Sequence, residues 1–284
     1  MSTIQTLNVI KKKHNFYMDM CTFCGVIINI NFFVFVNDSS KSLAAFGIGI
    51  VFVIIFATRA SKYDKMLRTQ YKSVFVKNIL SESLEDVHYD WNRGFTGPEI
   101  YALQLFHYGG HVSDNYLKAS CKGIRFEQAN VIHRDHGSNR FSFRGKVMII
   151  NNPFVNLEGI WVYTKKFSSY SLYAKKTQKY VLIQDNEFAE IFDIYITGEK
   201  DINHIFTAEI KQRLLLLAKK YKSFGLCFKG RKLNIAIGTP RKAFEIGDYS
   251  KEIIYDVEVE RIRQDVADIA EVIEILGNIK NESY

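Results

Sequence analysis

The 284-residue sequence contains only four cysteines and three prolines. So few cysteines do not form the disulfide framework of a small secreted protein, and they fit a reducing compartment. So few prolines exclude a proline-rich linker or tail. Cys21 and Cys24 form a C-x-x-C pair inside an apolar run, where no second ligand pair completes a zinc site. We interpret them as small residues embedded in a membrane, with Cys121 and Cys227 isolated elsewhere.

Catalytic signatures are also lacking. The sequence contains no P-loop, G-x-G-x-x-G, G-x-S-x-G or H-E-x-x-H motif. Its only His/Asp cluster, His133 to His136, falls in an expected turn, where a solvated loop is favoured over a metal site. Glu187, Glu190 and Asp193 could share a helical face, but no partner acid, base or pocket can be inferred for them. The sequence predicts no catalytic residue, cofactor or metal, and it favours a non-enzymatic protein.

The chain carries a formal net charge of +8, which suits either nucleic acid or an anionic membrane surface. Much of the excess lies at Lys11–Lys13 and between Arg59 and Lys77, beside two apolar runs. No motif of a nucleic-acid-binding module occurs. Anionic lipid explains the charge without a further partner, so we expect no nucleic acid.

The two apolar runs extend over Met20–Asn37 and Ser42–Thr58, with four residues between them. A membrane-spanning helix needs about 17 to 25 apolar residues, and both runs are at the short end of that range. The sequence therefore predicts a transmembrane helical hairpin over residues 16–58. Two alternatives are less favoured. One is a signal peptide with Lys11–Lys13 as its basic region, which lacks a small-residue cleavage site, and the other is a buried soluble hairpin.

Basic residues flank both runs on the side away from the short loop. Because lysine and arginine accumulate on the cytoplasmic side, both termini are expected there. Some 225 residues after the hairpin would then lie in the cytoplasm, against the inner leaflet of the membrane. The expected contacts with the membrane surface are Lys11, Lys12, Lys13, Arg59, Lys62, Lys65 and Arg68.

Four residues in the runs suggest how the two helices pack. Asn29 and Asn31 are polar groups at membrane depth, and interhelical hydrogen bonding is favoured over a polar transport pathway. Ala45 and Gly49 have the small-xxx-small spacing that allows close backbone approach.

In the rest of the chain, segments with apolar residues at helical spacing and segments with strand signals predict an α+β fold. We expect an antiparallel sheet with flanking helices. A basic N-terminus is expected over residues 1–15, before the hairpin. After the hairpin, we expect a juxtamembrane helical region over residues 59–114 and the α+β domain over residues 115–250. Ser81 to Gly94 breaks the helical pattern, and Tyr108 to His111 is interpreted as a turn. The expected strands are Ile124–Ile132, Arg140–Ile150, Gly159–Lys165, Tyr170–Ala174, Tyr180–Gln184 and Asp193–Thr197, with a turn over His133–Asn139.

Helix signals are clearest near Thr96 and Thr207, which are expected to cap helices. Gly230 supplies the turn of a predicted hairpin between Phe224–Phe228 and Leu233–Ile237. The last helix, in the C-terminal segment 251–284, covers about Val257–Ile279. It carries a short heptad seam that favours docking on the domain over self-association: Val259, Ile262, Val266, Ile269, Ile273 and Leu276.

Several stretches resemble the DUF3137 family. They are Phe192–Thr197, His204–Thr207 with the helix to Leu217, and Phe228–Ile237, together with Ile124–Val131 and Phe143–Lys146. The resemblance covers roughly residues 10–245, with departures at Ala208 and Asp201–Asn203. It implies a bacterial membrane protein without an established enzymatic activity, and a LemA-type membrane protein as a partner.

Three hypotheses follow for the function. The first is a membrane-anchored interaction or scaffold protein that presents its α+β domain at the inner leaflet of a bacterial cytoplasmic membrane. The second is a subunit of a homo-oligomeric membrane assembly, which overlaps with the first. The third is a membrane-bound enzyme with an unrecognised site, acting on lipid or envelope precursors.

Overall fold

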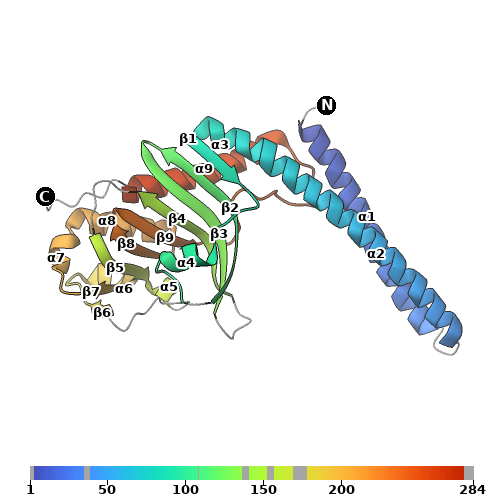
Figure 1. Ribbon diagram of the computed structural model, residues 1–284, viewed down its shortest axis with the longest axis horizontal. Helices are drawn as coiled ribbons and strands as arrows, with labels where there is room; N and C mark the ends of the chain where they lie inside the picture. The colour runs from blue at the N-terminus through green and yellow to red at the C-terminus, as the bar shows by residue number, and fades with distance from the viewer. Residues whose placement is uncertain are drawn as a thin grey trace. The chain divides into compact units, whose positions relative to one another are not determined.

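The computed structural model describes residues 3–34, 39–107, 109–135, 141–151, 157–168 and 178–277. The chain forms two compact units, each assembled from two separate segments (Figure 1). The first unit comprises Met1–Asn78 and Glu245–Arg261, and the second comprises Ile79–Phe244 and Ile262–Tyr284.

The first unit is built on two long helices, α1 (Thr3–Val34) and α2 (Ser39–Gln70). They pack lengthwise, with the rings of Tyr17 and Tyr63 stacked at 5.5 Å between centroids. Each has 32 residues and is therefore about 48 Å long, which exceeds the roughly 30 Å hydrocarbon core of a bilayer. The helical hairpin therefore extends well beyond its apolar runs. α2 continues through the π-helix η1 (Tyr71–Val76) into α3 (Lys77–Ser83).

The segment after Phe244 returns to this hairpin and is held there by backbone contacts. Asn8 donates from Nδ2 to the carbonyl of Ile253 and accepts from its N–H, both at 2.9 Å. The hydroxyl of Tyr249 donates to Oδ1 of Asp64 at 3.2 Å, and its burial raises the pKa of that phenol. A paired backbone costs little to bury, so these bonds keep the returning segment ordered.

The second unit contains a nine-stranded sheet in the order β1-β2-β3-β4-β9-β8-β5-β7-β6. All its neighbouring strands pair antiparallel. The strands are β1 (Glu85–Asp90), β2 (Gly109–Cys121), β3 (Ile124–Asp135), β4 (Phe141–Asn151), β5 (Leu157–Thr164), β6 (Gln178–Val181), β7 (Phe192–Thr197), β8 (Phe224–Gly230) and β9 (Lys232–Gly238).

Helices complete this unit: α4 (Gly97–Ala102), α5 (Lys165–Ser168), α6 (Asn186–Ile191), α7 (Ile202–Ile205), α8 (Ala208–Lys220) and the part of α9 (Tyr255–Gly277) after Arg261. Thr96 caps α4 through a capping box with Glu99, and the hydroxyl of Thr207 accepts from the N–H of Ile210 at the start of α8. Both caps satisfy backbone groups that a helix leaves unpaired.

Both faces of the sheet are covered. Adjacent residues on a strand point to opposite faces, and on β4 Val147 belongs to the core with Phe106 and Trp161. The neighbouring Lys146 faces Asp265 of α9 on the other side. Strands covered on both faces become continuously apolar rather than alternating, which explains the five consecutive buried residues that begin β8.

The structure confirms the α+β fold, the antiparallel sheet, the hairpin around Gly230 and the helix that Thr207 caps. The turn expected at Tyr108–His111 is wrong, because Gly109–His111 is the start of β2. The helical pattern breaks within Ser81–Gly94 as expected, since α3 ends at Ser83 and β1 follows. The expected strand Tyr170–Ala174 lies outside the described residues.

Candidate functional site

The most unusual surface of the first unit is an apolar band on its two long helices. Large apolar side chains there are between 39% and 61% exposed. Those on α1 are Phe16, Met18, Phe23, Val26, Ile27 and Ile30, and those on α2 are Phe46, Ile48, Ile50, Val51, Phe52, Ile54 and Ile55. A continuous exposed apolar surface of this kind marks a membrane or protein interface.

Within the described side chains, one helix is long and apolar enough to cross a membrane, Phe46–Ser83. Its most apolar stretch is almost entirely exposed, unlike the core helix of a globular protein. The first apolar run continues into residues 31–45, whose side chains lie outside the described part of the chain. One membrane-length helix is therefore found, and a second membrane crossing stays a prediction.

Gly49 lies where the two helices touch. A Cβ built on it would come within 2.5 Å of Cγ1 of Ile28, so only glycine fits at this position without a shift. Among the described residues, the amide of Asn29 donates to the carbonyl of Gly25 in its own helix at 2.8 Å, and the expected bond across the hairpin stays a prediction. The side chains of Asn31 and Ala45 lie outside those described.

A basic collar of exposed cations flanks the apolar band. It consists of Lys12, Lys13, Arg59, Lys62 and Lys65. Two residues expected in this surface are placed differently. Lys11 is only 4% exposed, and its ammonium donates to the backbone carbonyls of Asp248 and Lys251.

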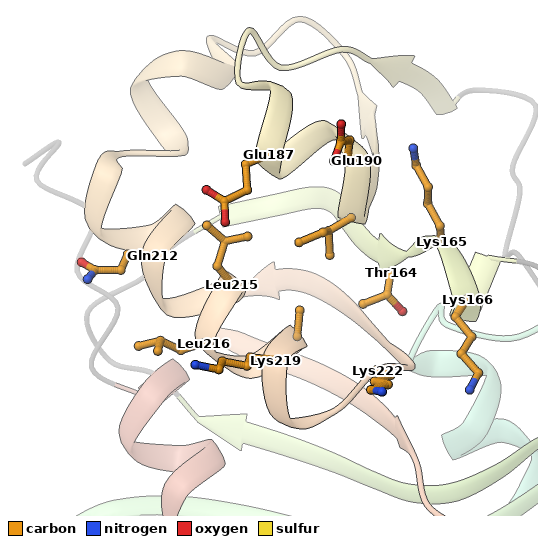
Figure 2. A pocket seen from close by; sticks show the side chains of 12 residues that line it. Thr164, Lys165, Lys166, Glu187, Glu190, Gln212, Leu215, Leu216, Lys219 and Lys222 are labelled. Atoms are coloured by element: carbon orange, nitrogen blue, oxygen red, sulfur yellow. The ribbon is translucent and has the colours of Figure 1, made fainter.

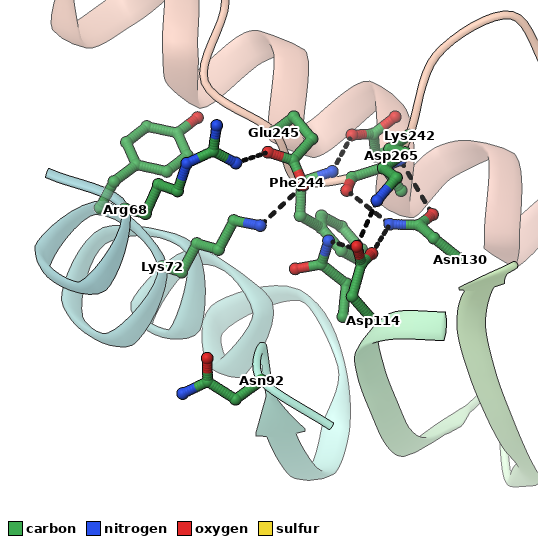
Figure 3. A network of polar contacts seen from close by, with 12 residues as sticks. Arg68, Lys72, Asn92, Asp114, Asn130, Lys242, Phe244, Glu245 and Asp265 are labelled. Atoms are coloured by element: carbon green, nitrogen blue, oxygen red, sulfur yellow. Dashed lines mark hydrogen bonds and ion pairs between the residues drawn. The ribbon is translucent and has the colours of Figure 1, made fainter. Parts of the chain in front are cut away.

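Arg68 is the second residue that differs from the expectation. Its guanidinium lies 2.8 Å from Asp64 and 3.6 Å from Glu245, so carboxylates of this chain already neutralise it (Figure 3). Lys72 is buried and its ammonium lies 2.7 Å from the same Glu245. Lys11, Arg68 and Lys72 therefore hold the returning segment through its backbone carbonyls and Glu245.

A second polar cluster, in the sheet unit, is centred on Asp265 of α9. Its carboxylate accepts from the guanidinium of Arg241 at 2.7 and 3.2 Å. It also accepts from the backbone N–H of Phe244 at 2.9 Å (Figure 3). Asn130 of β3 both donates to and accepts from the backbone of Ala243. The cluster therefore holds residues 241–244 against the sheet and α9, and the sequence offers no pattern that predicts it.

Burial also perturbs a lysine in this cluster. Lys146 is almost fully buried, and the loss of solvation lowers the pKa of its ammonium, which Asp265 and Asp268 oppose. A perturbed pKa can mark a functional group. Here the lysine lines none of the described cavities, so packing between β4 and α9 accounts for it.

His133 has a different environment from the one expected. It lies within β3 rather than in a solvated turn, with its ring stacked on Phe106 at 5.1 Å. Its Nε2 donates to the carbonyl of His107 at 3.0 Å, and its Nδ1 lies 2.7 Å from the hydroxyl of Ser142. It is a core histidine, and the described residues contain no group of three potential metal ligands.

The remaining candidates are accounted for by packing. The six seam residues of the last helix, Val259, Ile262, Val266, Ile269, Ile273 and Leu276, are all buried in the single chain. The seam is therefore not available for a coiled coil. The four cysteines are free thiols, with Cys121 and Cys227 buried.

The fold and the hairpin define a class: an α+β protein with an antiparallel sheet and a helical hairpin that has an exposed apolar band. The chain belongs to the DUF3137 family, described as a protein family of unknown function, whose family model matches residues 137–280. The match runs from β4 through α9, so it includes the last helix and excludes the hairpin. No curated protein and no solved structure matches the chain.

Proposed function

We propose that this protein is anchored in a bacterial cytoplasmic membrane by both helices of its hairpin, with both termini in the cytoplasm. There it presents the sheet unit to a partner, as a non-enzymatic interaction protein. A second copy of the chain or a LemA-type membrane protein is the partner that we propose.

The apolar band is the observation that carries this proposal. Burying one large aliphatic or aromatic side chain contributes about 1.5–3 kcal/mol, and thirteen such side chains are exposed along α1 and α2. A bilayer supplies the missing apolar environment, and helices satisfy their own backbone within it. The collar supports the orientation, because Lys12 and Lys13 on α1 and Arg59, Lys62 and Lys65 on α2 flank the band on its terminal side.

Membrane extraction tests the anchor. We expect the full chain to stay in the membrane pellet after alkaline carbonate washing. A lysine near the centre of a spanning helix costs about 3 kcal/mol, so Val51→Lys combined with Ile54→Lys should release a large fraction. Val257→Lys is the matched control, because Val257 is 59% exposed but lies outside the band. Equal extraction of the wild type and both variants would contradict the anchor.

The orientation has its own test. Impermeant thiol labelling of Thr3→Cys or Glu274→Cys in spheroplasts should give no signal until the membrane is permeabilised, and the Glu274 side chain is 60% exposed. Replacing the five collar cations by glutamine should raise the labelled fraction before permeabilisation, because the positive charge that retains the ends is lost. Labelling of either cysteine variant in intact spheroplasts, with the five collar cations in place, would contradict the proposed topology.

A further inference from the structure

Two adjoining hollows lie on the sheet unit and share Lys166 as a wall. The first has a volume of about 600 Å³ and lies between α5, α6 and α8 (Figure 2). The second has a volume of about 410 Å³ and is lined by Arg144, Ser223 and Thr239. Each is within the size range of small-molecule sites, which is about 300–1,000 Å³.

The first hollow has an apolar lining formed by Ile191, Leu215 and Leu216. Leu216 is 53% exposed, although it projects from the well-formed helix α8. An alkyl chain lying over these side chains would remove their surface from water, which is favourable in proportion to the area covered. This hollow therefore suits the apolar part of a ligand.

Charge is distributed unevenly around the two hollows. Lys165, Lys166, Lys219 and Lys222 line the first one, and Arg144 adds a cation in the second. Figure 2 shows Glu187 and Glu190 on α6, on the side opposite Lys219 and Lys222. The carboxylates disfavour an anion near α6, whereas Lys166 and Arg144 favour one at the junction of the two hollows.

The second hollow offers the donors that a phosphate group needs. Arginine matches phosphate oxygens with two N–H donors, and lysine supplies a point charge. The hydroxyl of Ser223 lines the same space as Arg144 and Lys166, whereas the hydroxyl of Thr239 already donates to the carbonyl of Arg241 at 2.9 Å. A phosphate monoester has three terminal oxygens to satisfy, so it uses this donor set more fully than a carboxylate does.

We propose that these hollows form one binding site for a single-chain amphiphile with a phosphate monoester head. Arg144 and Lys166, with the hydroxyl of Ser223, hold the phosphate, and Leu215 and Leu216 contact the alkyl chain. The phosphate could belong to a soluble metabolite or to a membrane lipid, and the experiment separates these two sources. The site does not depend on the proposed anchor, because all its residues lie in the sheet unit.

Lysine footprinting of the full chain in phosphatidylcholine nanodiscs tests this site. Octyl phosphate should protect Lys166 and Lys222 from an acylating reagent, read out by mass spectrometry, while the exposed Lys232 stays reactive. Inorganic phosphate should need a concentration roughly tenfold higher for the same protection, because it lacks the chain contacts. Equal protection by inorganic phosphate, or equal protection of Lys232, would overturn the proposal.

Variants of exposed residues separate the two halves of the site without threatening the fold. Arg144→Ala and Leu216→Ser should each raise the octyl phosphate concentration for half-protection by roughly tenfold, whereas Arg231→Ala should leave it unchanged. Glu187→Gln should lower that concentration, because it removes a negative charge near the ligand. Unchanged protection in both Arg144→Ala and Leu216→Ser would refute the site.

Nanodiscs containing lysophosphatidic acid, a single-chain lipid with a phosphate monoester head, identify the source of the ligand. Protection of Lys166 and Lys222 by this lipid, without octyl phosphate, would support the site and indicate a membrane lipid. Protection by octyl phosphate alone would support the site and indicate a soluble ligand. Protection by neither would overturn the proposal.

Discussion

The ammonium of Lys146 on β4 lies 3.9 Å from Oδ1 of Asp265 on α9, and both side chains are almost completely buried. Asp265 also accepts from Arg241 and from the backbone N–H of Phe244. One carboxylate thus balances two cations and satisfies a backbone donor. Removing a single partner from a buried ion pair is costly, because the other charge stays buried without compensation.

Asp265→Asn should therefore destabilise the sheet unit by about 3 kcal/mol, at the lower end of the range for such pairs, because Asp268 still lies 3.7 Å from Lys146. Asp268→Asn is the matched control, since its side chain is 23% exposed, and we expect a loss below about 1 kcal/mol. Urea unfolding followed by the fluorescence of buried Trp161 measures both. Equal losses in the two variants would contradict the role of Asp265.

The buried ammonium makes stability depend on pH in the alkaline range. Burial lowers the pKa of Lys146 below its ordinary value of 10.5. Between the lowered value and 10.5 the unfolded chain binds more protons than the folded one, so the free energy of unfolding rises with pH. Below this window Lys146 is charged in both states, and the gain is absent.

The variant Lys146→Met should lose this dependence. The difference in unfolding free energy between the wild type and Lys146→Met should therefore shift in favour of the wild type as pH rises toward 10.5. The comparison cancels the contributions of other groups that titrate there. Lys118→Met, at an exposed position on β2, serves as the control for the loss of one lysine. A flat difference for Lys146→Met would show that burial does not perturb its ammonium.

Gln128 on β3 is a polar residue where an apolar one would fit. It is 1% exposed and lies opposite Met148 of β4. Within the described part of the chain neither its amide nitrogen nor its oxygen has a hydrogen-bond partner. A buried polar group without a partner costs about 1–3 kcal/mol, so Gln128→Leu should raise the free energy of unfolding by about that amount.

The neighbouring Asn130 provides the opposite case on the same strand. Its amide makes hydrogen bonds to Asp114 and to both backbone groups of Ala243. Asn130→Leu should therefore destabilise the protein, because it leaves those groups unpaired. Destabilisation by Gln128→Leu in the same urea titration would indicate a bound water or ligand that satisfies its amide.

The sequence predicted those parts of the fold that local patterns determine. Gly230 has a positive φ of 61° in the β8–β9 turn, and Thr207 accepts the capping bond at α8. In contrast, β2 begins with Gly109 and Gly110, which locally favour a turn. Only pairing with Arg134 and Asp135 of β3 makes this segment a strand. Pairing over a long sequence separation has no local signature.

In the candidate site, too, local features could be predicted and tertiary contacts could not. The apolar band could be predicted from the sequence, because an apolar run of membrane length is a local feature of the chain. The roles of Lys11 and Arg68 could not, because they depend on a segment more than 170 residues later that returns to the hairpin. The Asp265 cluster likewise brings together β3, β4 and α9 through tertiary packing alone.

The contact of Gly49 with Ile28 leads to a prediction about the hairpin itself. An added side chain at Gly49 meets Ile28 at 2.5 Å, whereas one at Gly47 meets nothing within 4 Å. Gly49→Leu should therefore force α1 and α2 apart, and Gly47→Leu should not. Small residues at such contacts are what allows membrane helices to approach closely.

Cross-linking measures this separation directly. The thiol of Cys21 lies 3.9 Å from the carbonyl oxygen of Val53, so Val53→Cys in a Cys24→Ser background places two thiols across the hairpin. A short bifunctional thiol reagent should join them efficiently in this background and with Gly47→Leu. With Gly49→Leu the yield should fall roughly fivefold, because overpacking at a helix contact shifts the backbone. Equal yields for the two glycine variants would show that Gly49 does not set the distance between the helices.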